Sequence, residues 1–130
     1  MSRTKIDYGI DLGTTNSAIV RMESGEPKIK KTDTLKDTMP SCVYFNKKKS
    51  ISVGDSAYNS YKRDKLGAMR SFKAGSSNAF IEFKRTMGTD KNYPSSFMEK
   101  EYSSEQLSSE ILKTLKSFIT DDDISSAIIT

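Results

Sequence analysis

The stretch that decides the fold lies near the N-terminus and reads Ile10, Asp11, Leu12, Gly13, Thr14, Thr15, Asn16. Apolar residues alternate with polar residues or glycine from Ile6 to Leu12, which is the period of two of a half-buried strand. The apolar residues 18–20 predict a second strand. A carboxylate, a glycine and two hydroxyls therefore lie at a tight turn, where glycine permits a conformation or close approach that a Cβ would block. This arrangement predicts a turn that faces phosphate.

Composition and charge limit the kinds of protein that this chain can be. The 130 residues carry 21 basic and 17 acidic side chains, with 35% hydrophobic residues and no tryptophan. We expect one domain, or one piece of a larger one, with a modest core. Short basic clusters at 28–31 and 47–49 are typical of solvated loops, and no aromatic stacking platform accompanies them. We therefore expect no nucleic-acid binding.

Cysteine and histidine usage excludes several chemistries. Cys42 is the only cysteine and histidine is absent, which rules out an internal disulfide framework and disfavours zinc sites and histidine-based catalysis. Residues 1–5 are polar, and no apolar run approaches the ~20 residues of a membrane span. We expect a cytoplasmic protein without a membrane segment.

The first half of the chain predicts two hairpins. A turn at 24–26 leads to a third short strand through Ile29, and strands at 42–45 and 51–53 flank a charged tip. Asp55 is expected to cap a short helix through Tyr61. The following residues to Ser77 show no sustained period and give no assignment.

The segment after Ser77 predicts a short helix. Apolar residues recur at i, i+3 and i+7 between Phe80 and Met87, and we expect Asn78 to cap this helix and Gly88 to end it. The loop 89–94, which contains a proline, is expected to be a break.

The last part of the chain carries the strongest helix prediction, over 104–120, with Ser103 and Gln106 as a capping box. The three aspartates at 121–123 are more typical of a solvated connection than of a metal cluster. Residues 127–129 begin a new apolar run. We expect the chain to be a truncated piece whose last strand belongs to a larger sheet.

Several stretches, in order, resemble the seventy-kilodalton heat-shock chaperones, members of the actin, hexokinase and chaperone ATPase superfamily. The main matches are Ile10–Ala18, Met39–Val43, Ser52–Ala57 and Phe83–Gly88. The segments 109–113 and 127–130 are also similar to the family, so the resemblance covers nearly the whole chain and is weakest between 58 and 77.

The resemblance implies an α/β fold, namely part of lobe I of an actin-like, ribonuclease-H-like ATPase with a mixed sheet and flanking helices. Residues 1–39 and 103–130 would form part of its central subdomain, and residues 40–102 its upper subdomain. The rest of the ATPase domain and the peptide-binding domain would follow Thr130.

The resemblance also implies site residues. Asp11 would orient water around Mg²⁺, and Lys84 would reach the γ-phosphate and the attacking water as the catalytic residue. A carboxylate beside polyphosphate is repelled unless a cation lies between them, and a lysine is a compact point charge, so both roles are chemically reasonable. The nucleotide-binding residues implied are Gly13, Thr14, Thr15, Asn16 and, in an auxiliary role, Arg85.

The same residues also have ordinary structural interpretations. Asp11 can cap its turn, Thr14 and Thr15 can be common turn residues, and Lys84 can be a solvated helix lysine. The ordered companion motifs favour the functional roles.

We expect a fragment of an ATP-dependent molecular chaperone whose ATP hydrolysis controls the binding of unfolded polypeptides, with co-chaperones as partners and ATP/ADP and Mg²⁺ as cofactors. The fragment itself is expected to be nearly inactive. The alternatives are an actin-like filament protein or sugar kinase that shares only the turn, and a binding-only module with basic patches. The Phe83–Gly88 match favours the chaperone, and a P-loop motif is absent.

Overall fold

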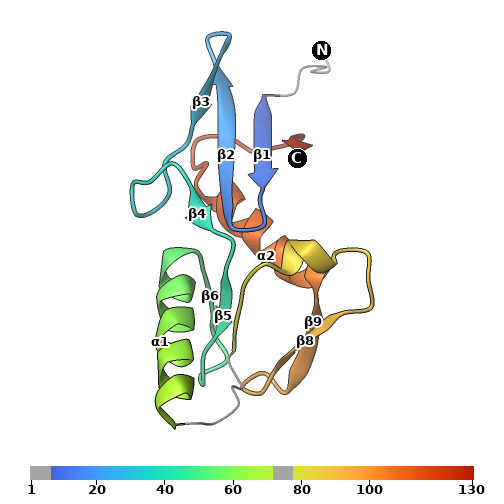
Figure 1. The fold of residues 1–130 in the computed structure, drawn as a ribbon. Helices are drawn as coiled ribbons and strands as arrows, with labels where there is room; N and C mark the ends of the chain where they lie inside the picture. The colour runs from blue at the N-terminus through green and yellow to red at the C-terminus, as the bar shows by residue number, and fades with distance from the viewer. Residues whose placement is uncertain (1–6, 72–77) are drawn as a thin grey trace.

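The computed structural model describes residues 7–71 and 78–130. Its larger sheet has the strand order β10-β1-β2-β3, with β4 paired to β2 (Figure 1). β10 runs parallel to β1, and the other neighbours are antiparallel, so the expected mixed sheet is confirmed. The strands are β1 (Tyr8–Leu12), β2 (Asn16–Glu23), β3 (Glu26–Ile29), β4 (Met39–Pro40) and β10 (Ile128–Ile129).

The alternating pattern at the N-terminus forms the predicted hairpin of β1 and β2. Tyr8, Ile10 and Leu12 are buried, because residues two apart on a strand share one face of the sheet. The turn from β2 to β3 has positive φ at Ser24 and Gly25, the backbone that a two-residue hairpin turn requires. The predicted connections on both sides of β2, from β1 and to β3, are therefore confirmed.

Helix α2 (Ser104–Ser117) packs on the larger sheet through Leu107, Ile111 and Leu115, none of which is exposed. Its capping box is confirmed, since the Ser103 hydroxyl accepts from the Gln106 amide at 3.1 Å and Gln106 Oε1 accepts from the Ser103 amide at 2.8 Å. The helix ends at Ser117, earlier than predicted.

A second sheet has the order β6-β5-β7, and helix α1 packs against it (Figure 1). Its elements are β5 (Val43–Phe45), β6 (Ile51–Val53), β7 (Ala79–Phe80) and α1 (Asp55–Ser71). The predicted helix at Asp55 is confirmed, but it is longer than expected, because α1 runs for 17 residues. The predicted cap is wrong, since the Asp55 carboxylate bonds to Thr34 and Lys36 instead. Packing against the sheet stabilises a helix that its weak periodicity does not predict.

The helix predicted between Asn78 and Gly88 is also wrong. β7 occupies its start, and only the 3₁₀ helix η1 (Phe83–Thr86) follows. The buried side chain of Asn78 caps no helix, and its Oδ1 accepts from Ser95 Oγ at 2.6 Å and from the Phe97 amide at 3.1 Å. Pairing with β5 makes this segment extended, since the Phe45 amide donates to the Asn78 carbonyl at 3.0 Å.

The expected break at 89–94 instead leads into the hairpin of β8 (Asn92–Ser95) and β9 (Lys100–Ser103). Pro94 is tolerated because, among the strands that the structure describes, β8 pairs with β9 alone, and at its other edge a missing N–H costs no ladder bond. The ring of Tyr102 stacks on Phe45 at a centroid distance of 4.5 Å, which joins this hairpin to the second sheet.

The three aspartates after α2 are exposed as predicted, but two of them accept hydrogen bonds from side chains of β1 and β2. Arg21 donates to Asp121 at 2.7 Å, and the Tyr8 hydroxyl donates to Asp122 at 2.6 Å. Across the described residues, no cluster of three or more histidine, cysteine or acidic side chains is arranged for a metal ion. Nor does any helix in this part of the chain have the length and apolarity to cross a membrane.

Candidate functional site

The centre of the candidate site is the turn Gly13–Asn16 between β1 and β2. The strands pair up to Leu12 and Ser17, so the chain must reverse within four residues. A Cβ at Gly13 would lie 2.1 Å from the carbonyl oxygen of Asn16, far inside van der Waals contact. Glycine at this position is therefore required by the turn itself.

The turn carries hydrogen-bonding groups that the protein does not use. Among the described residues, the amides and hydroxyls of Thr14 and Thr15 donate no hydrogen bond, and the Asp11 carboxylate has no partner. Asp11, Thr15 and Asn16 are exposed, and Thr14 is half-buried. Such unpaired donors at a turn form a cradle for anionic oxygens.

A small cavity of about 100 Å³ adjoins the two threonines. Its lining also includes Ile81 and Glu82, which directly precede η1. The complete lining consists of Thr14, Thr15, Pro40, Ser41, Cys42, Tyr58, Ile81 and Glu82. Segments far apart in the sequence thus meet beside the turn.

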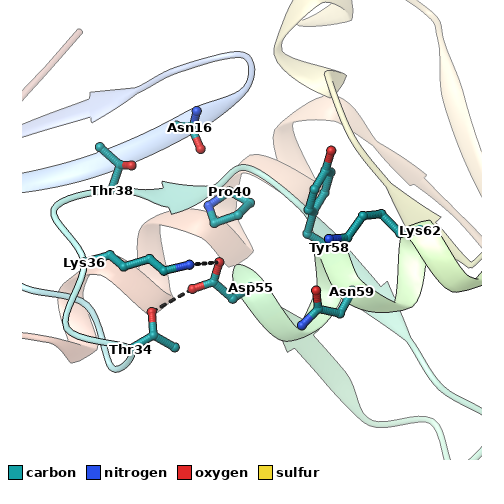
Figure 2. A pocket seen from close by; sticks show the side chains of 9 residues that line it. All are labelled: Asn16, Thr34, Lys36, Thr38, Pro40, Asp55, Tyr58, Asn59 and Lys62. Carbon is teal, nitrogen blue, oxygen red and sulfur yellow. Dashed lines mark hydrogen bonds and ion pairs between the residues drawn. The ribbon is translucent and has the colours of Figure 1, made fainter.

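A larger cavity of about 530 Å³ lies between the loop after β3 and the first turns of α1 (Figure 2). Asn16 borders this cavity, so the turn lies at the edge of both cavities. Figure 2 shows Lys36 reaching the Asp55 carboxylate at 3.3 Å, with Thr34 donating to the same carboxylate at 2.7 Å. These bonds, that of Thr34 above all, lower the pKa of Asp55.

The predicted catalytic residue, Lys84, and its neighbour Arg85 lie on η1. Lys84 is half-buried, and within the described part of the chain its ammonium has no hydrogen-bond or ion-pair partner. Arg85 is exposed, with its Nε 3.8 Å from a Glu82 carboxylate oxygen. The small cavity therefore brings Thr14 and Thr15 together with Ile81 and Glu82, the residues before η1, whereas Asn16 lines only the larger cavity. Asp11, Gly13, Lys84 and Arg85 line neither of these two cavities.

The position of η1 is set by its C-terminal end. Thr86 Oγ1 lies 2.7 Å from Tyr93 Oη and 2.5 Å from Ser104 Oγ, and it donates to the Phe83 carbonyl at 3.0 Å or to one of these hydroxyls. The Phe83 ring is buried in the core. The lysine-bearing turn is thus fixed between the core and the N-terminus of α2, while Lys84 stays free.

Sequence reasoning missed several residues around the turn, above all Ser41 and Tyr58, which border the small cavity. Ser41 lies inside the Met39–Val43 match, which was the available signal. Burial raises the pKa of the neighbouring Cys42 thiol to about 12, so this cysteine is an inert core residue.

The family model for "Hsp70 protein" matches residues 7–130. The chain belongs to the Hsp70 family. It is 34% identical over 114 residues to "Chaperone protein DnaK" of Mesomycoplasma hyopneumoniae strain J, which covers 88% of this chain and 16% of the relative. The DnaK proteins of strains 232 and 7448 match with the same identity and coverage.

This Hsp70 chain spans about 16% of the length of the curated relatives that it matches. The unpaired donors at 14–15 fit a phosphate group, and the exposed Asp11 carboxylate fits a hydrated Mg²⁺, which takes few protein ligands.

Proposed function

We propose that this Hsp70 chain supplies the first phosphate-binding turn of an ATP-hydrolysing chaperone, in which the nucleotide state controls binding of unfolded polypeptides together with co-chaperones. The observation that carries the proposal is the turn Gly13–Asn16, whose threonine amides and hydroxyls are unpaired within the described residues and adjoin a cavity. Ile81 and Glu82, which also line this cavity, directly precede the 3₁₀ helix that carries Lys84, and this supports a role for Lys84 beside the turn.

The proposed division of roles follows the chemistry of each group. Thr14 and Thr15 hold phosphate oxygens, with Gly13 and Asn16 shaping the turn and Arg85 in an auxiliary role. Asp11 holds Mg²⁺ through water, and the ion, when bound, neutralises phosphate charge. Lys84 places a positive charge where negative charge develops during transfer of the γ-phosphate to water.

We further propose that the fold is part of lobe I of an actin-like, ribonuclease-H-like domain. The division into 1–39 with 103–130 and 40–102 is supported by the two sheets. The larger sheet draws on residues up to Pro40 and on β10, and the second sheet on residues 43–80. The cytoplasmic location stays a prediction from the sequence.

Membership of the Hsp70 family argues against an actin-like filament protein or a sugar kinase. The binding-only module has less support in the first basic cluster, because two of its residues, Lys30 and Lys31, form ion pairs with Glu23 and Asp37.

The test is a titration of the 130-residue chain with MgATP and MgADP, followed by the NMR signals of its backbone amides. We expect shifts at Thr14, Thr15 and Lys84 that weaken when EDTA removes Mg²⁺, and ATP turnover near background. The variant Lys84→Met should lose affinity for ATP more than for ADP, whereas Lys116→Met, in the last turn of α2, should change neither. Shifts that avoid the turn would contradict the proposal.

A further inference from the structure

Ser41, in the connection between β4 and β5, makes two hydrogen bonds to the phosphate turn. Its hydroxyl donates to the Gly13 carbonyl at 2.8 Å, and its backbone amide donates to the Thr15 carbonyl at 2.8 Å. Its Oγ also lies 2.7 Å from the Oγ of Ser17. Ser17 and Ser41 are 1% and 3% exposed, so water does not compete for these bonds.

The direction of the hydroxyl bonds follows from proton counting. A serine hydroxyl has one proton to donate, and a carbonyl can only accept. The Ser41 hydroxyl therefore donates its proton to the Gly13 carbonyl, and the Ser17 hydroxyl must donate to the Ser41 oxygen. The three groups form a directed chain from Ser17 through Ser41 to the Gly13 carbonyl.

This chain controls which groups of the turn face a ligand. The carbonyl and amide of one trans peptide unit point in opposite directions. Holding the Gly13 carbonyl against Ser41 therefore aims the Thr14 amide the other way, and holding the Thr15 carbonyl does the same for the Asn16 amide. A carbonyl oxygen turned toward phosphate would repel it, whereas an amide attracts it.

We propose that Ser41 is a positioning residue for phosphate binding, which keeps two carbonyls turned away from the anion, with Ser17 orienting its hydroxyl. The inference rests on the proposed role of the turn. It adds Ser41 and Ser17 to the residues that shape the site, and both act on the turn rather than on the ligand. Removal of the Ser41 hydroxyl frees the Gly13–Thr14 peptide to rotate, so the turn loses preorganisation while its two threonines stay in place.

The test compares Ser41→Ala, Ser17→Ala and Ser41→Thr in the full chain, with Ser60→Ala as the matched control. Ser60 is also buried, but its hydroxyl donates to Ser56 within α1. Ser41→Ala should weaken MgATP binding roughly tenfold, the scale of one lost hydrogen bond. Ser17→Ala should have a smaller effect, because Ser41 can still donate to Gly13. Ser41→Thr, which keeps the hydroxyl, should recover most of the affinity.

Two further readouts separate positioning from a general structural role. The amide signals of Thr14 and Thr15, recorded without nucleotide, should shift in Ser41→Ala, because the Gly13–Thr14 peptide is no longer held, while hydrogen-exchange protection across β1 and β2 is retained. Unchanged signals at these amides, or equal loss of protection across the larger sheet, would overturn the inference. If the unaltered chain binds no MgATP, the proposed function fails, and these nucleotide-free amides still decide the role of Ser41.

Discussion

At the scale of single residues, backbone conformation limits what the turns tolerate. Gly13 has no room for a Cβ, and it serves the candidate site directly. Leu35 shows the opposite case, because its backbone has φ of 61° while its side chain is 80% exposed. A leucine at this position adopts the unfavourable left-handed backbone, and its exposed side chain gains no packing energy that would offset the cost.

We predict that Leu35→Gly stabilises the chain. Left-handed backbone costs a non-glycine residue roughly 1–2 kcal/mol, and the greater freedom of glycine in the unfolded state offsets part of this, so the net gain should be about 0.5–1 kcal/mol. Urea denaturation measures the change in the free energy of unfolding. Leu35→Ala is the control, since it removes the side chain but keeps the Cβ; a gain in this variant equal to that of glycine would contradict the explanation.

At the scale of elements, the 3₁₀ helix η1 depends on one hydroxyl. Thr86 Oγ1 connects Phe83 at the start of η1 with Tyr93 of β8 and the buried Ser104 of α2. The Gly88 amide adds a second link to α2 by donating to Glu105 at 2.8 Å. The lysine-bearing element is therefore positioned by contacts outside itself.

We predict that Thr86→Val destabilises the chain by about 1–3 kcal/mol, because it leaves the hydroxyls of Tyr93 and Ser104 without a shared partner. The shape of the side chain is preserved, so the loss reports the hydrogen bonds. Chemical denaturation followed by circular dichroism measures it. Thr114→Val, whose hydroxyl bonds only to Glu110 of its own helix, should change stability by less than about 0.5 kcal/mol. Equal effects of the two substitutions would refute the role of Thr86.

At the scale of the whole molecule, Asp55 joins the loop between β3 and β4 of the larger sheet to α1, which packs on the second sheet. Thr34 and Lys36 lie in that loop, and both bond to the Asp55 carboxylate. Because the folded state lowers the pKa of Asp55, its contribution to stability is present above the unfolded value near 3.8. It is lost as the pH falls through the folded pKa.

We predict that Asp55→Asn lowers the free energy of unfolding at pH 7 by about 0.5–1 kcal/mol, the modest scale of a partly exposed pair. The difference from the unaltered chain should shrink steadily below pH 5, as measured by urea denaturation across pH. Asp33→Asn, in the same loop and without a hydrogen bond or ion pair among the described residues, should show no such trend. A constant difference at all pH values would exclude the carboxylate as the cause.

Local sequence signals predicted the elements that local physics dictates. The period of two before Gly13 determines β1, and the Ser24–Gly25 turn determines the hairpin of β2 and β3. Ser103 and Gln106 mark the start of α2. The proposal that the turn faces phosphate also came from its residue types, since glycine and threonine at a strand-to-strand turn suffice to suggest it.

Only the tertiary structure decided the elements whose neighbours are distant in the chain. Asn78 became part of a buried polar cluster with Ser95 because β7 pairs with β5, which overrode its capping preference. α1 extended beyond its prediction because the second sheet covers one of its faces. Ser41 contacts Gly13 across 28 positions of sequence, so no local pattern revealed it. The sequence by itself determined the turn and its flanking strands, because their pattern is local; the tertiary structure decided what holds the turn, because hydrogen bonds between distant segments exist only once the chain has folded.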